Sequence, residues 1–347
     1  MLPLGKKRDR MGRSFPFHPP HALPMFRKKS KNTFLKTAVD FAVYTAIRLV
    51  IAIVGIFSIE RFHDIAVGLA WLVTDVIPVR RKTLRENLRF SFPELTPREE
   101  KALIRRMWEH LLLMGEEFFA ARRMIHKENW CLRVEAGQAQ EMIHLFFQHR
   151  PLIMVTGHFG NFEMGGYILG VLGYPTFSVA RQLDNRFLDR YIGKLRAETG
   201  QYIIDKNEGF DDILSVIEGN GRLAFLADQS AGPRGCWVDF FGRPASAYKA
   251  MALLSLQYNA PILVCDVSRV NNTPMRFRIE PLGFFDPLAP PEGIESVFEI
   301  TQWFTSLLER RIRQTPEQYW WLHRRWKTYG KKISLDTIHR KIRYNLP

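Results

Sequence analysis

Apolar runs of strand length alternate with helical stretches through most of this 347-residue chain, and that alternation restricts its fold more than any other feature. Alternation of this kind predicts an α/β sheet covered by helices. An amphipathic helix over residues 97–125 precedes the alternating region. The expected strands cover 151–155, 175–180, 222–227, 261–268 and 275–280, and the expected helices between them cover 161–171, 185–199, 209–218 and 247–259.

The composition fits one large globular domain with an N-terminal extension. Hydrophobic residues make up 46% of the chain, which is enough for a sizeable core. The three cysteines, Cys131, Cys236 and Cys265, are scattered and odd in number. They predict neither a disulfide framework nor a CxxC metal site, and they fit a reducing cytoplasmic setting best.

The positive charge is concentrated at the two ends of the chain. Residues 1–36 hold ten Lys or Arg against Asp9 alone, and residues 323–347 hold eight against Asp336 alone. The middle of the chain is nearly neutral. Two basic tails on a neutral body predict an electrostatic tether to an anionic membrane surface. Nucleic acid is the competing partner, but no known nucleic-acid-binding module is present, so we expect none. A solvated, disordered N-terminal tail is compatible with either partner.

An apolar segment follows the first tail. Residues 41–59 are about long enough to cross a bilayer, and a second apolar stretch, 65–77, is too short to cross alone. Basic residues flank the whole region on both sides, which keeps both ends in the cytoplasm by the positive-inside rule. We expect a helix or shallow hairpin anchored in one leaflet; buried core helices are the alternative. A cleaved signal peptide is not expected, since no small-residue cleavage site follows a short apolar core.

These observations divide the chain into four regions. They are a basic flexible tail, a membrane-associated helix or hairpin, the main domain and a basic C-terminal tail, over residues 1–36, 37–78, 79–330 and 331–347.

One six-residue stretch, HFGNFE at 158–163, concentrates the chemistry. It comes after the expected buried strand 151–155, by way of a short turn. If a helix begins near Asn161, a favoured cap residue, Glu163 lies in its first turns and can fold back toward the imidazole of His158. A carboxylate that holds one ring nitrogen leaves the other free as a base. We therefore expect His158 and Glu163 to form a catalytic pair.

The same two residues have other interpretations. A histidine followed five residues later by glutamate is also common by chance. Its place after a strand favours a site, because open α/β sheets bind ligands at the carboxyl ends of their strands. A zinc site needs more ligands than this stretch supplies, and no Cys or second His lies nearby, so we expect no metal.

Several segments together carry a family resemblance. GHFGNFE resembles the HxxxxD/E block of the lysophospholipid acyltransferase superfamily, in particular its branch of lipid A lauroyl and myristoyl acyltransferases. Further segments are similar to blocks of that branch, in the same order: RKTLRENLRFSFPELTPREE, VARQLDN, LAFLADQ, FFGRPA and WWLHRRWK. The resemblance covers roughly residues 45 to 330 and implies a twisted mixed sheet covered by helices, similar to the glycerolipid acyltransferases.

The resemblance also extends the candidate site. It implies substrate-binding roles for a further set of residues: Arg181, Asn185, Asp228, Gln229, Arg324 and Arg325. Arg181 is suited to binding a phosphate through paired hydrogen bonds, although a surface salt bridge is the alternative interpretation. Asp228 follows a strand and is suited to binding acceptor hydroxyls, although it can equally cap a helix. Arg324 and Arg325 lie among tryptophans, which suits a membrane interface. Structural packing of those tryptophans is the alternative.

The function implied by the resemblance is O-acyl transfer. His158 would remove a proton from an acceptor hydroxyl, which attacks the thioester of an acyl carrier protein or acyl-CoA donor in one direct step, with backbone N–H groups stabilising the oxyanion. The expected acceptor is a lipid A precursor or related glycolipid at the cytoplasmic face of the inner membrane, and no cofactor is needed. A lysophospholipid or inositol mannoside acceptor, a hydrolase that uses water and a catalytically silent membrane scaffold remain alternatives.

Overall fold

A computed structural model of the chain describes residues 34–137, 144–327, 329–330 and 333–342. Almost all of the predicted N-terminal tail, and part of the predicted C-terminal tail, lie outside these ranges.

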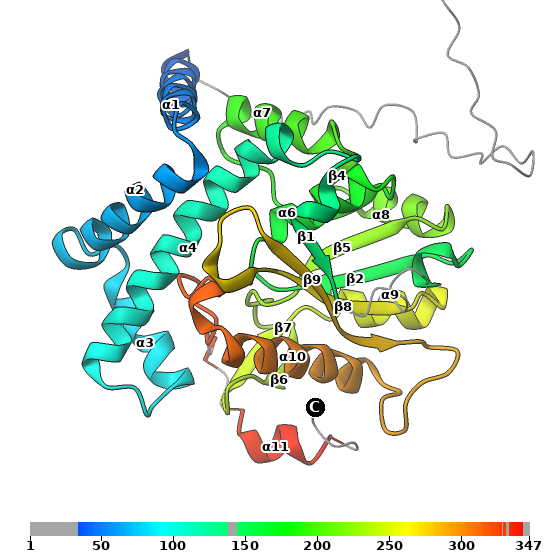
Figure 1. The fold of residues 1–347 in the computed structure, drawn as a ribbon. Coiled ribbons are helices and arrows are strands. Elements are labelled where there is room, and N and C mark those ends of the chain that lie inside the picture. Colours follow the sequence, from blue (N-terminus) through cyan, green and yellow to red (C-terminus); the bar gives the residue numbers. More distant parts are fainter. Residues whose placement is uncertain (1–33, 138–143, 328, 331–332, 343–347) are drawn as a thin grey trace, which may run out of the picture.

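The centre of the molecule is a mixed sheet of seven strands in the order β1-β9-β8-β2-β5-β3-β4 (Figure 1). Five neighbouring strands run parallel, while β9 runs antiparallel to β8 and pairs in parallel with β1. The strands are β1 Val134–Ala136, β2 Leu152–Thr156, β3 Thr176–Ala180, β4 Gln201–Asp205, β5 Arg222–Leu226, β8 Ile262–Arg269 and β9 Phe277–Phe285. A separate hairpin pairs β6 Cys236–Asp239 with β7 Pro244–Ala247.

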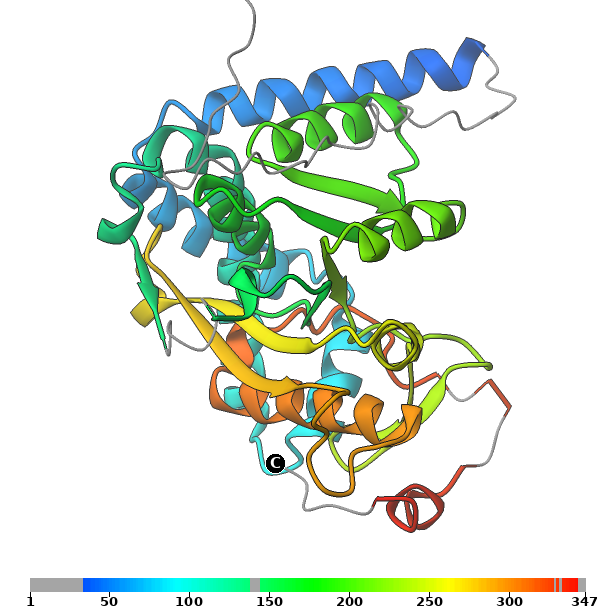
Figure 2. The same ribbon diagram turned by 90° about the vertical axis from the view of Figure 1, so that its right-hand side faces the viewer.

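Helices cover both faces of this sheet. On one face α8 Phe210–Glu218, α9 Ala250–Tyr258 and α10 Val297–Gln314 contribute to the largest apolar cluster. On the other face α4 Pro97–Met124 and α6 Phe162–Val171 pack against β8 and β9. Near β4, α7 Arg186–Ala197 lies alongside the N-terminal helix (Figure 2). The predicted class, a mixed α/β sheet covered by helices, is confirmed.

Local sequence explains the main elements. The run LIMVT of β2 is buried between neighbours on both sides, as a central parallel strand requires. The long helix α4 begins with a capping box between Thr96 and Glu99 and carries arginines in its last turn. A second capping box, between Ser296 and Glu299, starts α10. These caps fix where the two helices enter the domain.

The N-terminal region is a series of helices: α1 Phe34–Val54, α2 Ile59–Trp71 continued by a π-helical turn at Leu72–Val76, and α3 Arg81–Ser91. No residue of α1 is buried. Helix α2 is different, because Phe62, Ala66 and Ala70 are buried and the helix packs along α4. The second apolar stretch therefore contributes at least one face to the core, which was the alternative to a membrane hairpin.

Short connecting elements complete the chain: η2 Trp130–Leu132, η3 Val270–Asn272, η4 Pro316–Gln318 and α11 Leu335–His339. The segment around η4 runs beside the turn after β2, where Phe159 and Tyr319 form an isolated bridge. It thus brings the C-terminal part of the domain to the edge of the sheet that carries His158.

Candidate active site

Two neighbouring parallel strands bring a histidine and an aspartate together. In the register of β2 and β5, Thr156 lies opposite Leu226, and the chain reaches His158 and Asp228 two residues beyond each of them. The Nδ1 atom of His158 lies 2.8 Å from Oδ1 of Asp228. The backbone N–H of His158 donates to Oδ2 of the same carboxylate at 3.0 Å. One buried carboxylate therefore fixes both the ring and the backbone of His158.

The hydrogen bonds define the tautomer of the neutral imidazole. Because a carboxylate can only accept, Nδ1 of His158 carries a proton, and in the neutral ring Nε2 then keeps its lone pair. The side-chain amide of Gln229 lies 3.2 Å from this Nε2 and can donate to it. Burial would raise the pKa of Asp228, but the adjacent His158 and its hydrogen bonds outweigh burial and hold that pKa well below its usual range. Nδ1 of His158 is thus held by an ionised carboxylate.

The structure corrects the expected pairing of His158 with Glu163. Glu163 lies in the first turn of α6, as predicted, but its carboxylate binds the guanidinium of Arg196 on α7, with Nε to Oε2 at 3.0 Å and Nη2 to Oε1 at 2.5 Å. A two-pronged bond to a guanidinium is stronger than a bond to a neutral imidazole. The position expected for Glu163 at the ring of His158 is occupied by Asp228.

Gly160 and Asn161 hold the turn after His158 in place. Gly160 has a φ of +60°, and a Cβ there would lie 2.2 Å from the carbonyl oxygen of Val267. Glycine is therefore required for the close approach of β8. Asn161 caps α6, as predicted, by accepting from the N–H of Met164.

A second histidine borders His158. The ring of His323 lies 4.5 Å from that of His158, centroid to centroid, and stacks on Trp320. Burial, and next the neighbouring His158, lower the pKa of His323 to about 4, so its ring is neutral at physiological pH.

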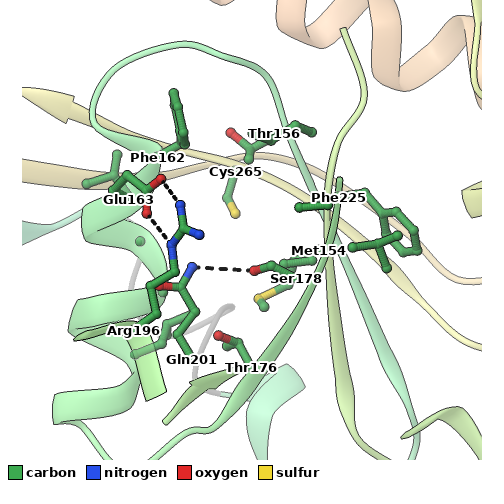
Figure 3. Close-up of a pocket in the computed structure, with 18 of the residues that line it drawn as sticks. Met154, Thr156, Phe162, Glu163, Thr176, Ser178, Arg196, Gln201, Phe225 and Cys265 are labelled. Carbon is green, nitrogen blue, oxygen red and sulfur yellow. Dashed lines mark hydrogen bonds and ion pairs between the residues drawn. The ribbon is translucent and has the colours of Figure 1, made fainter. Parts of the chain in front are cut away.

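Two cavities meet at this site. The first is lined by His158, Trp320 and His323 together with residues of α4, among them Phe118. The second lies between α6 and the sheet, and its lining is mostly apolar (Figure 3). Both share three wall residues: Phe162, Glu163 and Arg196.

The second cavity runs along the strands. Thr156 lies at the carboxyl end of β2, while Thr176 and Gln201 begin β3 and β4. In Figure 3 the Glu163–Arg196 ion pair lies beside α6, above Gln201 and Thr176. A long apolar group that entered beside the ion pair would therefore pass between α6 and the sheet.

Arg181 and Asn185 lie outside this centre. Arg181 follows β3, is exposed, and pairs with Asp184 at 2.6 Å. Asn185 caps α7 by accepting from two backbone N–H groups and donates to the carbonyl of Asp40 on α1. Its expected role in binding substrate is not supported, because the cap and the contact with α1 already use both polar atoms of its amide.

The terminal arginines differ from each other in burial. Arg324 is exposed, whereas Arg325 is buried, donates to the carbonyl of Ser246 at 2.6 Å and lies over the ring of Phe240. The predicted contact between Arg325 and substrate is therefore replaced by a structural one. Trp321 is also buried, and Trp326 stacks on Phe240, so these two tryptophans pack the core as the alternative interpretation held.

Asp228 was predicted from the sequence to bind substrate, but its contact with His158 was not predicted. The signal was present, since TGH at 156–158 and LAD at 226–228 each begin at the last residue of a strand and place their third residues side by side if the strands are parallel neighbours. Arg196, which lies in the last turn of α7 and matches no quoted motif, gave no such signal. Among the described residues, no group of three His, Cys, Asp or Glu side chains is placed to hold a metal ion.

A histidine held by a carboxylate at the carboxyl edge of a parallel sheet, beside an apolar cavity, fits an α/β enzyme that acts on a substrate with a long apolar group. Comparison with known families makes this class specific. Residues 26–328 match the model of the bacterial lipid A biosynthesis acyltransferases. The chain belongs to this family and is an acyltransferase.

Curated relatives agree with the family. The lipid A biosynthesis lauroyltransferase of Escherichia coli K12 is 24% identical over 274 residues, which cover 77% of this chain and 85% of that protein. The palmitoleoyltransferase of the same organism is 24% identical over 257 residues, covering 72% and 79%. A crystal structure of a 1-acyl-sn-glycerophosphate acyltransferase from Thermotoga maritima aligns over 78% of this chain and all of that one, at 14% identity and a TM-score of 0.35, too low to support further argument.

Proposed function

We propose that this protein transfers a fatty acyl chain from an acyl thioester to a hydroxyl of a lipid A precursor, with His158 as the general base. The observation that carries the proposal is the bond of 2.8 Å between His158 and Asp228, at a cavity that adjoins an apolar one. The family membership and the names of the relatives support lipid A as the class of acceptor.

The geometry supports a single direct transfer. Nε2 of His158 takes the proton of the acceptor hydroxyl as the hydroxyl oxygen attacks the thioester carbonyl, and the tetrahedral intermediate that forms then collapses with cleavage of the C–S bond. Asp228 stabilises the imidazolium that forms, and the imidazolium then returns its proton to the departing thiolate. For the hydroxyl to reach Nε2, the amide of Gln229 must give up its contact with that nitrogen. Base assistance of this kind contributes on the order of 10²- to 10⁴-fold.

The developing oxyanion requires donors. The first turn of α6 begins four residues after His158, and N–H groups in the first turn of a helix have no partner within that helix. They also carry the positive end of the helix dipole, which favours an anion. In this proposal the first-turn N–H groups that Asn161 does not cap stabilise the tetrahedral intermediate.

The apolar cavity supplies a place for the acyl chain. It adjoins the His158 cavity at Glu163 and Arg196, and it extends beneath α6 toward the beginning of β3. A chain that lies there would present its thioester at the mouth, near His158. The acyl donor is then an acyl carrier protein or acyl-CoA, whose thiol part stays outside the domain.

Helix α1 supports a membrane location. It is the one described helix that is long and apolar enough to cross a bilayer, and it exposes many large apolar side chains, for example Leu49, Val50 and Ile53. A glycolipid acceptor is itself embedded in a membrane. We infer that the enzyme works at the cytoplasmic face of the inner membrane, an anionic surface that its basic tails would also bind.

Acyl transfer by the detergent-purified full-length protein tests the proposal. Wild type and the His158→Ala variant would be supplied with labelled acyl carrier protein and a Kdo-bearing lipid A precursor. We expect product that depends on the precursor, and a loss of at least about 10²-fold in the variant. Release of free fatty acid without a need for precursor would indicate a hydrolase. Activity on a lysophospholipid alone would change the acceptor, and inactivity on all acceptors would indicate a scaffold.

A further inference from the structure

A buried ionic cluster lies behind the turn that carries His158. Its centre is Glu117 of α4, which is fully buried. Oε1 of Glu117 accepts from Nε of Arg269 and from the backbone N–H of Met275, both at 2.9 Å. Oε2 accepts from Nη2 of Arg269 at 2.5 Å and from the side-chain amide of Asn161 at 2.9 Å. The carboxylate therefore joins α4, the end of β8 and the cap of α6.

His110, two turns earlier on α4, completes the cluster. Its Nδ1 lies 2.8 Å from Nη1 of Arg269, and its Nε2 lies 3.1 Å from the carbonyl oxygen of Gly160. An arginine only donates, so Nδ1 accepts and the proton on Nε2 is donated to Gly160. Burial, and next the Arg269 cation, lower the pKa of His110 well below its usual value, which keeps the ring neutral.

The cluster contacts the turn that carries His158 in two ways. Directly, it holds Gly160 and Asn161, which lie two and three residues after His158. Through the backbone of Arg269, it also holds Gln318, whose side chain exchanges two hydrogen bonds with that backbone at 2.9 and 3.0 Å. The carbonyl of Gln318 in turn accepts from the N–H of Gly160, and the N–H of Trp320 donates to the carbonyl of His158.

We propose that Glu117, Arg269 and His110 are positioning residues for the acyl transfer reaction, because they fix the turn that presents His158 and the first turn of α6. This inference rests on the proposed role of His158 as the base. None of the three lines either of the cavities at the site, so they act through the turn and not on the substrate.

The buried cluster is better suited to positioning the turn of His158 than to stabilising the fold alone. A buried ion pair contributes little net stability compared with well-packed apolar side chains of similar volume. Here each polar atom of Glu117 and of the His110 ring is directed at Arg269 or at backbone and side-chain groups that flank the site. A displacement of catalytic groups by about 1 Å can cost about 10²-fold in rate, so rigid anchoring of this turn has a direct kinetic consequence.

The sharpest test uses Asn161, whose side chain both caps α6 and donates to Glu117. Asn161→Ser keeps an oxygen that can cap α6 but removes the amide that donates to Glu117. We expect kcat to fall by about tenfold or more with KM changed less than about threefold, while Tm falls by only a few degrees. His110→Leu should behave in the same way, and His110→Gln, which restores a donor and an acceptor, should recover part of the rate.

Glu100→Gln is the matched control. Glu100 is also a buried carboxylate of α4 and accepts from Arg85 and Arg89 at 2.6 and 2.9 Å, but these partners belong to α3 and not to the turn that carries His158. It should lower Tm and leave kcat unchanged. If Asn161→Ser and His110→Leu keep kcat within about twofold of wild type, or if Glu100→Gln loses kcat as they do, the cluster is only structural.

A readout without substrate keeps this test separate from the proposed function. The rate at which diethyl pyrocarbonate modifies His158, followed by peptide mass spectrometry, reports how firmly the turn is held. We expect modification in Asn161→Ser to be several-fold faster than in wild type and in Glu100→Gln. Faster modification in a protein whose wild type transfers no acyl group would uphold the anchoring and overturn the function; equal rates in all three proteins would overturn the anchoring.

Discussion

At the scale of single residues, the main result is which carboxylate holds His158. Asp228 accepts from the ring and from the backbone of His158, whereas Glu163 is bound to Arg196. The two acids differ in what their removal changes. Loss of Asp228 releases His158, and loss of Glu163 leaves Arg196 without this partner at the boundary of the two cavities.

We therefore expect Asp228→Asn to reduce kcat by about 10²-fold or more, because an amide cannot accept from both N–H groups of His158 and favours the wrong tautomer. Glu163→Gln should reduce kcat less. Steady-state kinetics of both variants measures the difference, with Asp286→Asn, which loosens an ion pair with Arg150 elsewhere, as the control. A larger loss of kcat in Glu163→Gln than in Asp228→Asn would restore the glutamate as the partner of the histidine.

A second residue-scale prediction concerns the apolar cavity. Ala224 lines it from the middle of β5, opposite Met154 on the neighbouring strand. Ala224→Leu adds three carbon atoms to the cavity wall, so long acyl chains lose room. We expect kcat/KM for the longest accepted donor to fall about tenfold or more while the shortest donor is affected little, since each displaced CH₂ is worth about 0.8 kcal/mol.

A series of acyl carrier proteins loaded with chains of different length measures this selectivity, and Ala224→Ser serves as the small-volume control. An equal loss for all chain lengths would place the acyl chain outside this cavity.

At the scale of elements, α1 is held to the domain mainly through α7. Phe41 packs edge-on against Phe187, and the guanidinium of Arg48 lies over the ring of Tyr191. These contacts are few, and most of the apolar surface of α1 faces away from the protein. A surface of this kind requires either a partner or a lipid phase.

The double variant Val50→Glu and Ile53→Glu of α1 should be released from membranes, because each charge opposes insertion by about 2.5 to 3.5 kcal/mol. The fold should survive, since both side chains are exposed, 58% and 57%. Flotation with vesicles of phosphatidylethanolamine and phosphatidylglycerol measures binding. The control is the double variant Leu132→Glu and Leu288→Glu, whose side chains are apolar, lie outside α1 and are at least as exposed. Unchanged flotation of the α1 variant would mean that another surface binds the lipid.

The elements also show how far sequence alone could lead. The strand at 152–156 and the cap at Asn161 follow from an apolar run and a favoured cap residue, so both could be predicted. Strand β4 could not, because its sequence QYIID is polar at both ends and its pairing depends on β3. The partner of His158 depends on which strands are neighbours, and that order is a property of the whole sheet. Glu163, which lies in the same motif as His158, was therefore the nearer choice of partner, and it was wrong.

At the scale of the whole molecule, burial of neutral histidines makes stability depend on pH. The pKa of His323 is about 4 in the folded protein and about 6.5 in an unfolded chain. Below pH 6.5 the unfolded state binds a proton that the folded state does not, so this stability is present above pH 6.5 and is lost as the pH falls toward 4. The lowered pKa of His110 acts in the same direction. Buried Asp266 has a raised pKa, which acts in the opposite direction, so a comparison of variants is needed.

The His323→Gln variant removes one of these groups and should lose less stability than wild type between pH 7 and pH 5, by about 1 to 2 kcal/mol. Chemical unfolding of the detergent-solubilised protein at the two pH values measures the difference, provided that unfolding is reversible. His149→Gln, at an exposed position, is the control and should follow wild type. If His323→Gln loses as much stability on acidification as wild type does, the ring of His323 is protonated in the folded state, and the site beside His158 carries one more positive charge than this structure indicates.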